Sequence, residues 1–488
     1  MSIRGAHHTT RTLKCVPGVL AEKQKTIVRA GVVVGLLVLA IAMGRFIGRG
    51  SVDPEMLLAV TVAPIGLLAF LRLGRFEYGI LSVMLTAGLL NFFTLPTGTE
   101  SRIVLSLLVT LGLVAAWILQ SLVVDKRFRL KSSPINKPLL AFVAISLVAY
   151  IWSNLFRDSL VFVWRSFPVV QVAALAVNIS LPVLALLVSN KIQEIKWLKW
   201  LAWLMVGMGA FVVVSILFGL PTDVFFWNGS SGLFAMWVVA LAYALALFDD
   251  KLDRRIRALL LLLVVAWLFR NFAQARIWVS GWLPLGIACI VITFMRSKKL
   301  FAVAVLAGLI YLNANFDYFY NEIVVANREE GGEQRLGLWE TNLGHVANHP
   351  LFGMGPAGYA VYNMTYNPQD ARSTHNNFFD ILAQTGIMGL GVFLWMFASF
   401  IRVGHQTRRA LAGRRNFEEA FAAACLAGCM AALAAMMLGD WVIPFAYNST
   451  ISGFDHSSFT WIFLGGMGSL YHIIQRRSSN TGDAFLAQ

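Results

Sequence analysis

Long uninterrupted runs of apolar residues are the feature that most limits the folds open to this chain. A bilayer core about 30 Å thick requires roughly 20 apolar residues in a helix. Hydrophobic residues make up 58% of the 488 residues and charged residues only 13%, whereas a soluble domain is about half apolar and a quarter charged. Backbone groups in lipid must be paired within the spanning segment, so these runs can cross a membrane only as helices. The sequence therefore predicts an all-α, polytopic transmembrane protein.

The apolar runs define fourteen candidate spans, and two of them, 257–270 and 300–315, are short. We therefore expect about 12 to 14 spans. The full set is 27–43, 54–71, 77–95, 103–124, 138–156, 168–189, 197–220, 230–248, 257–270, 277–295, 300–315, 379–401, 417–438 and 458–474.

The longest polar stretch between spans divides the chain into five predicted regions. It forms a large outer loop that is expected to contain short helices. The regions are a cytoplasmic N-terminal segment (1–26), N-terminal transmembrane helices (27–315), the large periplasmic loop (316–375), C-terminal transmembrane helices (376–475) and a cytoplasmic tail (476–488). A loop of this length in a compact protein usually has a function.

Lysine and arginine residues are distributed unevenly among the polar segments. Of the 40, 30 fall in alternate segments starting from the N-terminus, and 10 fall in the intervening segments. Cytoplasmic segments of membrane proteins carry such an excess, so we expect both termini in the cytoplasm and the long loop outside. The net charge of +15 is then explained by topology and does not indicate nucleic-acid binding.

The four cysteines lack the spacing of a disulfide or zinc framework. They are Cys15, Cys289, Cys425 and Cys429. No small-residue cleavage site follows the first apolar run, which is therefore expected to be a retained anchor and not a signal peptide.

The long loop is predicted to contain a helix from about Glu333 to Ala347. Its apolar residues recur at spacings of three and four, which places them in one stripe along a helix. They are Leu336, Trp339, Leu343 and Ala347. Arg335 lies beside this stripe near the helix start. Pro350 should end the helix, because the residue before a proline disfavours the helical conformation.

Two further patterns in the loop have both a structural and a functional interpretation. Gly353, Gly355 and Gly358 can form tight turns or cradle a phosphate, and turns are favoured because glycines alone are a weak signal. His345 and His349 are four residues apart, a spacing compatible with a metal pair. However, the helix is expected to end between them and no third ligand is evident, so no metal site is predicted.

His375 is the strongest candidate for chemistry. It precedes Asn376 and Asn377 and the apolar run of the next span, so we expect it at the outer membrane interface. An imidazole that titrates at about pH 6.5 can accept a proton at neutral pH. From position alone, an interfacial histidine that helps Asn376 to cap the helix is an equally good interpretation.

Arginines on the outer side need an explanation, because cytoplasmic segments normally hold them. A guanidinium group binds phosphate oxygens in a fork and keeps its proton. Arg276 is the most suggestive, because it opens a span, and charges just inside the membrane are usually functional or paired. The alternative is that each arginine reaches lipid headgroups. The outer arginines are Arg157, Arg165, Arg270, Arg276, Arg328, Arg335 and Arg372.

Four short patterns, in this order, resemble the signature of the O-antigen ligase and polymerase superfamily. They are an arginine–tryptophan pair, a histidine–proline turn with two glycines, a histidine–asparagine pair and a glycine turn into the next span. In this sequence they are Arg335 with Trp339, residues 349–356, His375 with Asn376 and Asn377, and residues 386–389. Arg276 also resembles the arginine that the family carries upstream of the loop. Ligases of this family are usually drawn with fewer than fourteen spans, which is the one departure.

The resemblance implies glycan transfer at the periplasmic face of the bacterial inner membrane, in lipopolysaccharide or exopolysaccharide assembly. Members take a glycan from undecaprenyl diphosphate and join it to lipid A–core, a polysaccharide or a protein, with no metal or other cofactor. Carried over, His375 would be the base or orienting group and Arg276 and Arg335 would hold the diphosphate. Arg165 and Arg270 are further diphosphate candidates, and Asn376, Asn377 and Arg372 are supporting candidates.

Two other classes remain open. A transporter of a small solute or a lipid-linked sugar would also contain broken helices and intramembrane charge. It should show charge near the middle of spans and matching repeats, whereas the charges here gather at the outer face and no repeat is evident. In a structural subunit without activity, His375 and Arg276 would be freely replaceable.

Overall fold

The computed structural model describes residues 75–91, 94–96, 102–219, 232–274, 279–321, 332–366, 374–447 and 451–481. The chain divides into two compact units. One comprises 1–74 and 118–128, and its described residues include the π-helix η1 (Gln120–Val124). The other comprises 75–117 and 129–488 and contains the remaining described elements, apart from the last two residues of α4 (Leu105–Leu119).

Helices occupy the predicted apolar runs. They are α3 (Phe76–Leu89), α4 (Leu105–Leu119), α5 (Asn136–Leu155), α6 (Phe167–Lys191), α7 (Ile195–Leu217), α8 (Gly232–Phe248), α9 (Arg254–Leu268), α10 (Val279–Arg296), α11 (Lys298–Ala314), α16 (Asn377–Leu411), α17 (Phe417–Ala435) and α18 (Gly453–Thr481). Each coincides with a predicted span, and the spans predicted at 27–43 and 54–71 lie outside the described residues. The all-α, polytopic fold class is confirmed.

Seven helices in the described part of the chain are long and apolar enough to cross a membrane. They are 105–123, α5, α6, α7, α10, α16 and α17. Two of the helices, α9 and α17, start from polar caps. Asp253 accepts a hydrogen bond from a backbone N–H at the start of α9, and Asn416 does the same for α17, which satisfies donors that have no partner within the helix.

The end of one predicted segment is wrong. The span predicted at 77–95 is too long, because α3 ends at Leu89 and the chain then forms an antiparallel hairpin of β1 (Thr94–Pro96) and β2 (Arg102–Val104). Pro96 explains the extended backbone, because a proline disfavours helix in the residue before it. At the other end of the chain, α18 continues to Thr481, so the predicted tail 476–488 begins as helix.

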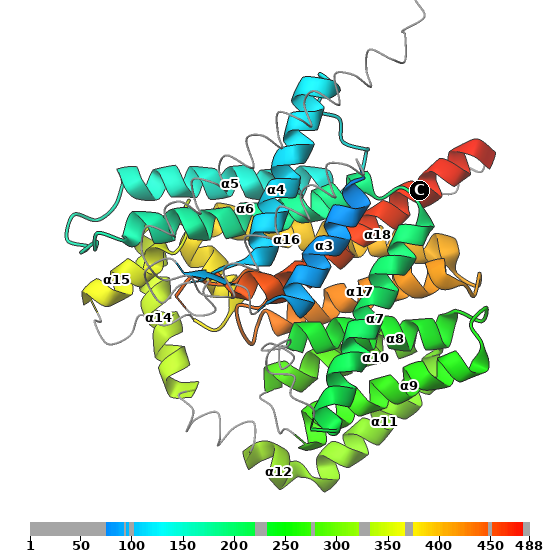
Figure 1. Ribbon diagram of the computed structural model, residues 1–488. Helices are drawn as coiled ribbons and strands as arrows, with labels where there is room; N and C mark the ends of the chain where they lie inside the picture. Colours follow the sequence, from blue (N-terminus) through cyan, green and yellow to red (C-terminus); the bar gives the residue numbers. More distant parts are fainter. Residues whose placement is uncertain are drawn as a thin grey trace, which may run out of the picture. The chain divides into compact units, whose positions relative to one another are not determined.

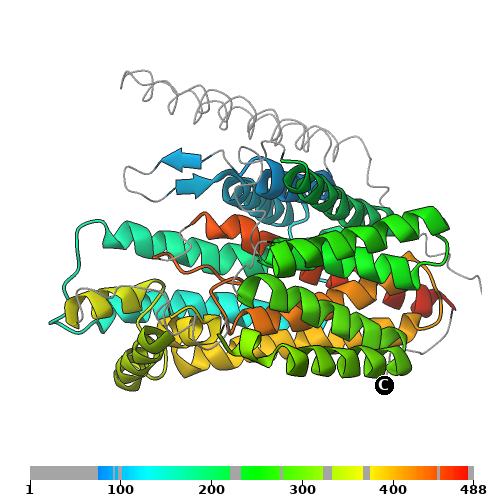
Figure 2. The ribbon, with the colours of Figure 1, turned by 90° about the horizontal axis from the view of Figure 1, so that it is seen from below.

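Close packing of α8, α17 and α18 forms part of the core. α18 also lies along α6, and α16 lies between α5 and α17 (Figures 1 and 2). Trp237 of α8 is fully buried, donates from Nε1 to Thr460 Oγ1 at 2.9 Å, and stacks on Phe463. A Cβ at Gly428 of α17 would lie 2.4 Å from the Trp237 ring. The absence of a side chain at this glycine therefore lets α17 approach the indole.

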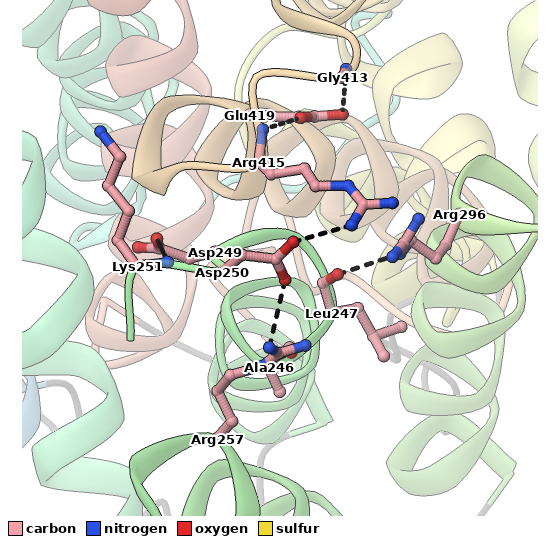
Figure 3. A network of polar contacts seen from close by, with 10 residues as sticks. All are labelled: Ala246, Leu247, Asp249, Asp250, Lys251, Arg257, Arg296, Gly413, Arg415 and Glu419. Atoms are coloured by element: carbon pink, nitrogen blue, oxygen red, sulfur yellow. Dashed lines mark hydrogen bonds and ion pairs between the residues drawn. The ribbon is translucent and has the colours of Figure 1, made fainter. Parts of the chain in front are cut away.

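One group of polar segments meets around Asp250, in the turn between α8 and α9 (Figure 3). Asp250 forms ion pairs of 3.1 Å with Arg257 and 3.0 Å with Arg415, which precedes α17. The Glu419 carboxylate accepts the backbone N–H groups of Gly413 and Arg415. These residues belong to segments predicted to share the basic, cytoplasmic side.

A second group of polar segments meets at the other ends of the helices. Tyr366 donates from its hydroxyl to Asp158 at 2.8 Å, and the Asn377 amide donates to the Ile443 carbonyl oxygen at 2.7 Å. All four residues come from segments predicted to be outside. The contacts thus agree with the predicted alternation of the segments, while the orientation in the membrane stays a prediction.

Candidate functional site

The described part of the long loop contains α12 (Phe316–Tyr320), α14 (Gly332–Asn348) and α15 (Gly358–Tyr366). α14 confirms the helix predicted over 333–347. The apolar pattern does not predict α15, which has nine residues and would be marginal alone in water. Its Tyr359 and Val361 are buried in a cluster with Phe167 of α6 and Phe445. Tertiary packing therefore stabilises this helix.

The turn 349–355 contacts the point where α16 is interrupted. Gly386 has φ 67° and ψ −171°, so the helix breaks there and nearby backbone groups lose their helical partners. Three backbone N–H···O bonds of 2.9 Å join the turn and the break: Met354 to Ala383, Gly355 to Gln384, and Ile387 to Pro350. The turn thus replaces the hydrogen bonds that the broken helix lacks.

Glycine is required at the two positions where these backbones meet. Gly353 has φ 64°, and Gly386 is also in the positive-φ region, which residues with a side chain rarely adopt. A Cβ at Gly353 would lie 2.5 Å from the Ala383 carbonyl oxygen, and a Cβ at Gly386 would lie 2.3 Å from that of Leu351. The turn interpretation of Gly353 is confirmed. Two of the four signature patterns, residues 349–356 and 386–389, therefore contact each other.

His375 directly precedes the N-cap of α16 and has φ 52°. A left-handed conformation is uncommon for a residue with a side chain and persists only where the surrounding structure fixes it. Thr374 and Asn376, on either side, are buried, whereas His375 is partly exposed. The fold therefore anchors the neighbours of His375 and leaves the histidine itself partly accessible.

The two asparagines after His375 hold the start of α16. Asn376 Oδ1 accepts the backbone N–H groups two and three residues later, at 2.9 and 3.4 Å, a cap typically worth about 1 kcal/mol. Asn377 is fully buried, donates to the Ile443 carbonyl oxygen at 2.7 Å and accepts the Val442 N–H at 2.9 Å. The cap thus belongs to Asn376, and Asn377 ties α16 to the segment before α18.

Thr374, the residue before His375, bonds to α14 and α16 directly and is linked to α15 through Asp380. Its carbonyl oxygen accepts from Trp339 Nε1 of α14 at 2.8 Å. Its hydroxyl lies 2.6 Å from Asp380 Oδ1 in the first turn of α16. Tyr359 of α15 donates from its hydroxyl to the same carboxylate oxygen, also at 2.6 Å. The tryptophan of the signature therefore holds the backbone next to His375.

The roles of Thr374, Tyr359 and Asp380 are missed by reasoning from sequence. A signal existed for Asp380, because an acidic residue in the first turn of a helix is favoured by the helix dipole. Tyr359 offers no such signal, because its partner lies in another helix. Burial and the carboxylates of Asp380 and Asp440 raise the pKa of Tyr359, so its hydroxyl stays protonated and remains a donor.

Three of the predicted arginines are incompletely described. Arg276 and Arg372 lie outside the described residues. Arg335 lies in the first turn of α14, one helical turn before Trp339, and only its backbone is described. Their convergence on one ligand stays a prediction.

The remaining two arginines lie in different parts of the fold. Arg165 is exposed in the turn before α6. Arg270 lies in the π-helix η2 (Phe269–Gln274), donates to Asn271 Oδ1 at 2.9 Å and lies over the Trp267 ring at 5.7 Å. Its described contacts stay within α9 and η2. A shared arginine site remains a prediction.

His345 and His349 contact Tyr362 of α15, with ring centroids 5.6 and 5.2 Å apart. Burial lowers the pKa of both imidazoles, so the rings are mainly neutral at pH 7. The Tyr362 hydroxyl accepts the Asp158 N–H at 3.2 Å. The two histidines therefore help to join α14 and α15 to the α5–α6 connection.

Residues 278–394 match the family model described as O-antigen ligase. This part of the chain is therefore an O-antigen ligase domain. The O-antigen ligase domain covers about a quarter of the chain and contains α14, α15, His375 and the interruption in α16. All four signature patterns lie inside it, so the resemblance is confirmed at the level of the superfamily. A search of curated proteins found no match to the chain.

Proposed function

We propose that this protein is a membrane glycosyltransferase that acts at the periplasmic face of the inner membrane. It would move a glycan from undecaprenyl diphosphate to lipid A–core, a polysaccharide or a protein. The main support is the setting of His375 in the O-antigen ligase domain. Its neighbours Thr374 and Asn376 are fixed by contacts to several helices, and it remains partly exposed. A side chain held in this way can meet a substrate that arrives from outside the fold.

The transfer forms a bond between an acceptor oxygen and the anomeric carbon and breaks the bond from that carbon to the diphosphate. His375 would accept the proton of the acceptor hydroxyl as that oxygen attacks. Undecaprenyl diphosphate would leave with the bonding electron pair, so the negative charge ends on the diphosphate. Attack from the face opposite the leaving group inverts the anomeric centre, as in direct displacement at sugars generally.

Arginine side chains are proposed to stabilise the departing diphosphate. Each guanidinium offers a fork of donors and keeps its charge, so a group of them can neutralise the leaving group without a metal ion. Arg335 is supported by its place one turn before Trp339, which bonds the residue next to His375. Arg276 is the second main candidate. Arg165 and Arg270 are further candidates.

A strain that lacks this protein tests the reaction class. We expect loss of long-chain surface glycan and accumulation of the undecaprenyl-diphosphate-linked precursor. A defect in solute uptake with normal surface glycans would instead indicate the transporter. The precursor that accumulates then serves as the donor for assays with the purified protein.

Variants of His375 test its role with that donor. His375→Ala should lower turnover by roughly 10²–10⁴, the usual value of positioned acid–base assistance. Turnover should also fall at acid pH as the imidazole becomes protonated, and this dependence should be absent from the variant. His405→Ala, at an exposed position in the same helix, is the matched control and should retain full turnover.

His375→Asn separates a chemical role from a structural one. Asparagine adopts the left-handed conformation more readily than most residues, so this variant should fold at least as well as the wild type. Low turnover of a well-folded His375→Asn protein supports the chemical role. Near-normal turnover would return His375 to a structural role and leave the arginines as the only candidates.

A further inference from the structure

A buried carboxylate next to His375 receives hydrogen bonds from two hydroxyl groups. Thr374 Oγ1 and Tyr359 Oη each lie 2.6 Å from Asp380 Oδ1. None of the three residues is more than 1% exposed. Short hydrogen bonds inside a protein are not weakened by competition with water. Asp380 therefore fixes the position of the Thr374 side chain.

The backbone of Thr374 is fixed as well. Its carbonyl group and the N–H of His375 belong to one peptide plane, and Trp339 donates to that carbonyl oxygen at 2.8 Å. On the far side, Asn376 is held as the cap of α16. Its carbonyl oxygen also lies 3.0 Å from the Thr374 hydroxyl. His375, whose φ is 52°, therefore lies between two residues that are both held by contacts to other elements.

We propose that Thr374 is a positioning residue whose hydroxyl, held by Asp380, keeps His375 in its left-handed conformation and directs the imidazole to the acceptor. This inference rests on the proposed function, because it assumes that His375 takes part in the transfer. Tyr359 of α15 donates a second hydrogen bond to the same Asp380 oxygen and so helps to hold it in place. Thr374 acts through His375 and does not contact the substrates.

Two substitutions at Thr374 separate the hydroxyl from the shape of the side chain. Thr374→Val keeps the branched shape and removes the donor, whereas Thr374→Ser keeps the donor. Misplacement of a reacting group by about 1 Å can cost about 10²-fold, so Thr374→Val should lower turnover by up to about that factor. Thr374→Ser should remain close to the wild type. Binding of undecaprenyl diphosphate alone should be the same in both variants and in the wild type.

A double-mutant cycle with His375→Ala tests whether Thr374 acts through the histidine. Thr374→Val should cause no further loss in the His375→Ala protein, and long incubations with radiolabelled donor keep the residual rate measurable. The inference is overturned if Thr374→Val retains full turnover, weakens undecaprenyl diphosphate binding, or lowers turnover by the same factor in both backgrounds. Full turnover of His375→Ala itself would refute the proposed function, an outcome distinct from the other three.

Discussion

Replacement of Gly386 by alanine should strongly destabilise the O-antigen ligase domain. The φ of 67° and ψ of −171° at this position cost about 1–3 kcal/mol for a residue with a side chain. The new Cβ would lie 2.3 Å from the Leu351 carbonyl oxygen, a backbone atom that can move only if the turn 349–355 moves. Such a shift breaks the three 2.9 Å hydrogen bonds of the contact, each worth about 0.5–1.5 kcal/mol. The total loss is on the order of 3–7 kcal/mol.

Gly391→Ala is the matched control for this substitution. Gly391 lies five residues further along α16, and no atom is within 4 Å of a Cβ built there. Alanine is favoured over glycine in a helix interior by about 1 kcal/mol, so this variant should be as stable as the wild type or slightly more. Both proteins can be unfolded in detergent micelles by titration with sodium dodecyl sulfate and followed by tryptophan fluorescence. A Gly386→Ala protein with the stability of the Gly391→Ala protein would refute the contact described for the turn.

Three further predictions address topology, the leaving group and pH. Cysteines introduced at Asn327 and Gln369 should react with an impermeant reagent applied to the periplasmic side, and labelling only after permeabilisation of the inner membrane would reverse the orientation. Arg276→Lys should lower transfer strongly, because lysine keeps the charge and loses the fork; a folded variant with full transfer would remove Arg276 from the site. Burial lowers the pKa of His345 from 6.5, so below about pH 6.5 the unfolded state binds more protons than the folded state and the free energy of unfolding should fall. That fall should be smaller in His345→Gln, and equal pH profiles would contradict the assignment.

Reasoning from sequence was most successful where the signal is local. The apolar runs predict the helices because each span must satisfy its own backbone. The stripe that includes Trp339 predicts α14 because residues three and four apart share a helix face. It was less successful at the site. The cap of α16 by Asn376 was part of one interpretation of this segment, whereas the anchoring role of Thr374 was missed.

The amino-acid sequence by itself determined the fold class, the order of the helices and the likeness of the segment 278–394 to the O-antigen ligase family. It also predicted which polar segments share a side, because basic residues are concentrated in alternate segments. These properties depend on hydrophobicity, periodicity and charge, which are read along the chain without knowledge of long-range contacts.

Only the tertiary structure decided how the signature patterns work together. Gly353 and Gly386 are far apart in sequence, and their backbones meet because each lacks a side chain at the contact. Asp380 holds Thr374 together with Tyr359 from another helix. Such hydrogen bonds depend on which elements pack against each other and at what distance. That is set by the complementary shapes of whole helices, and no local pattern in the sequence encodes it.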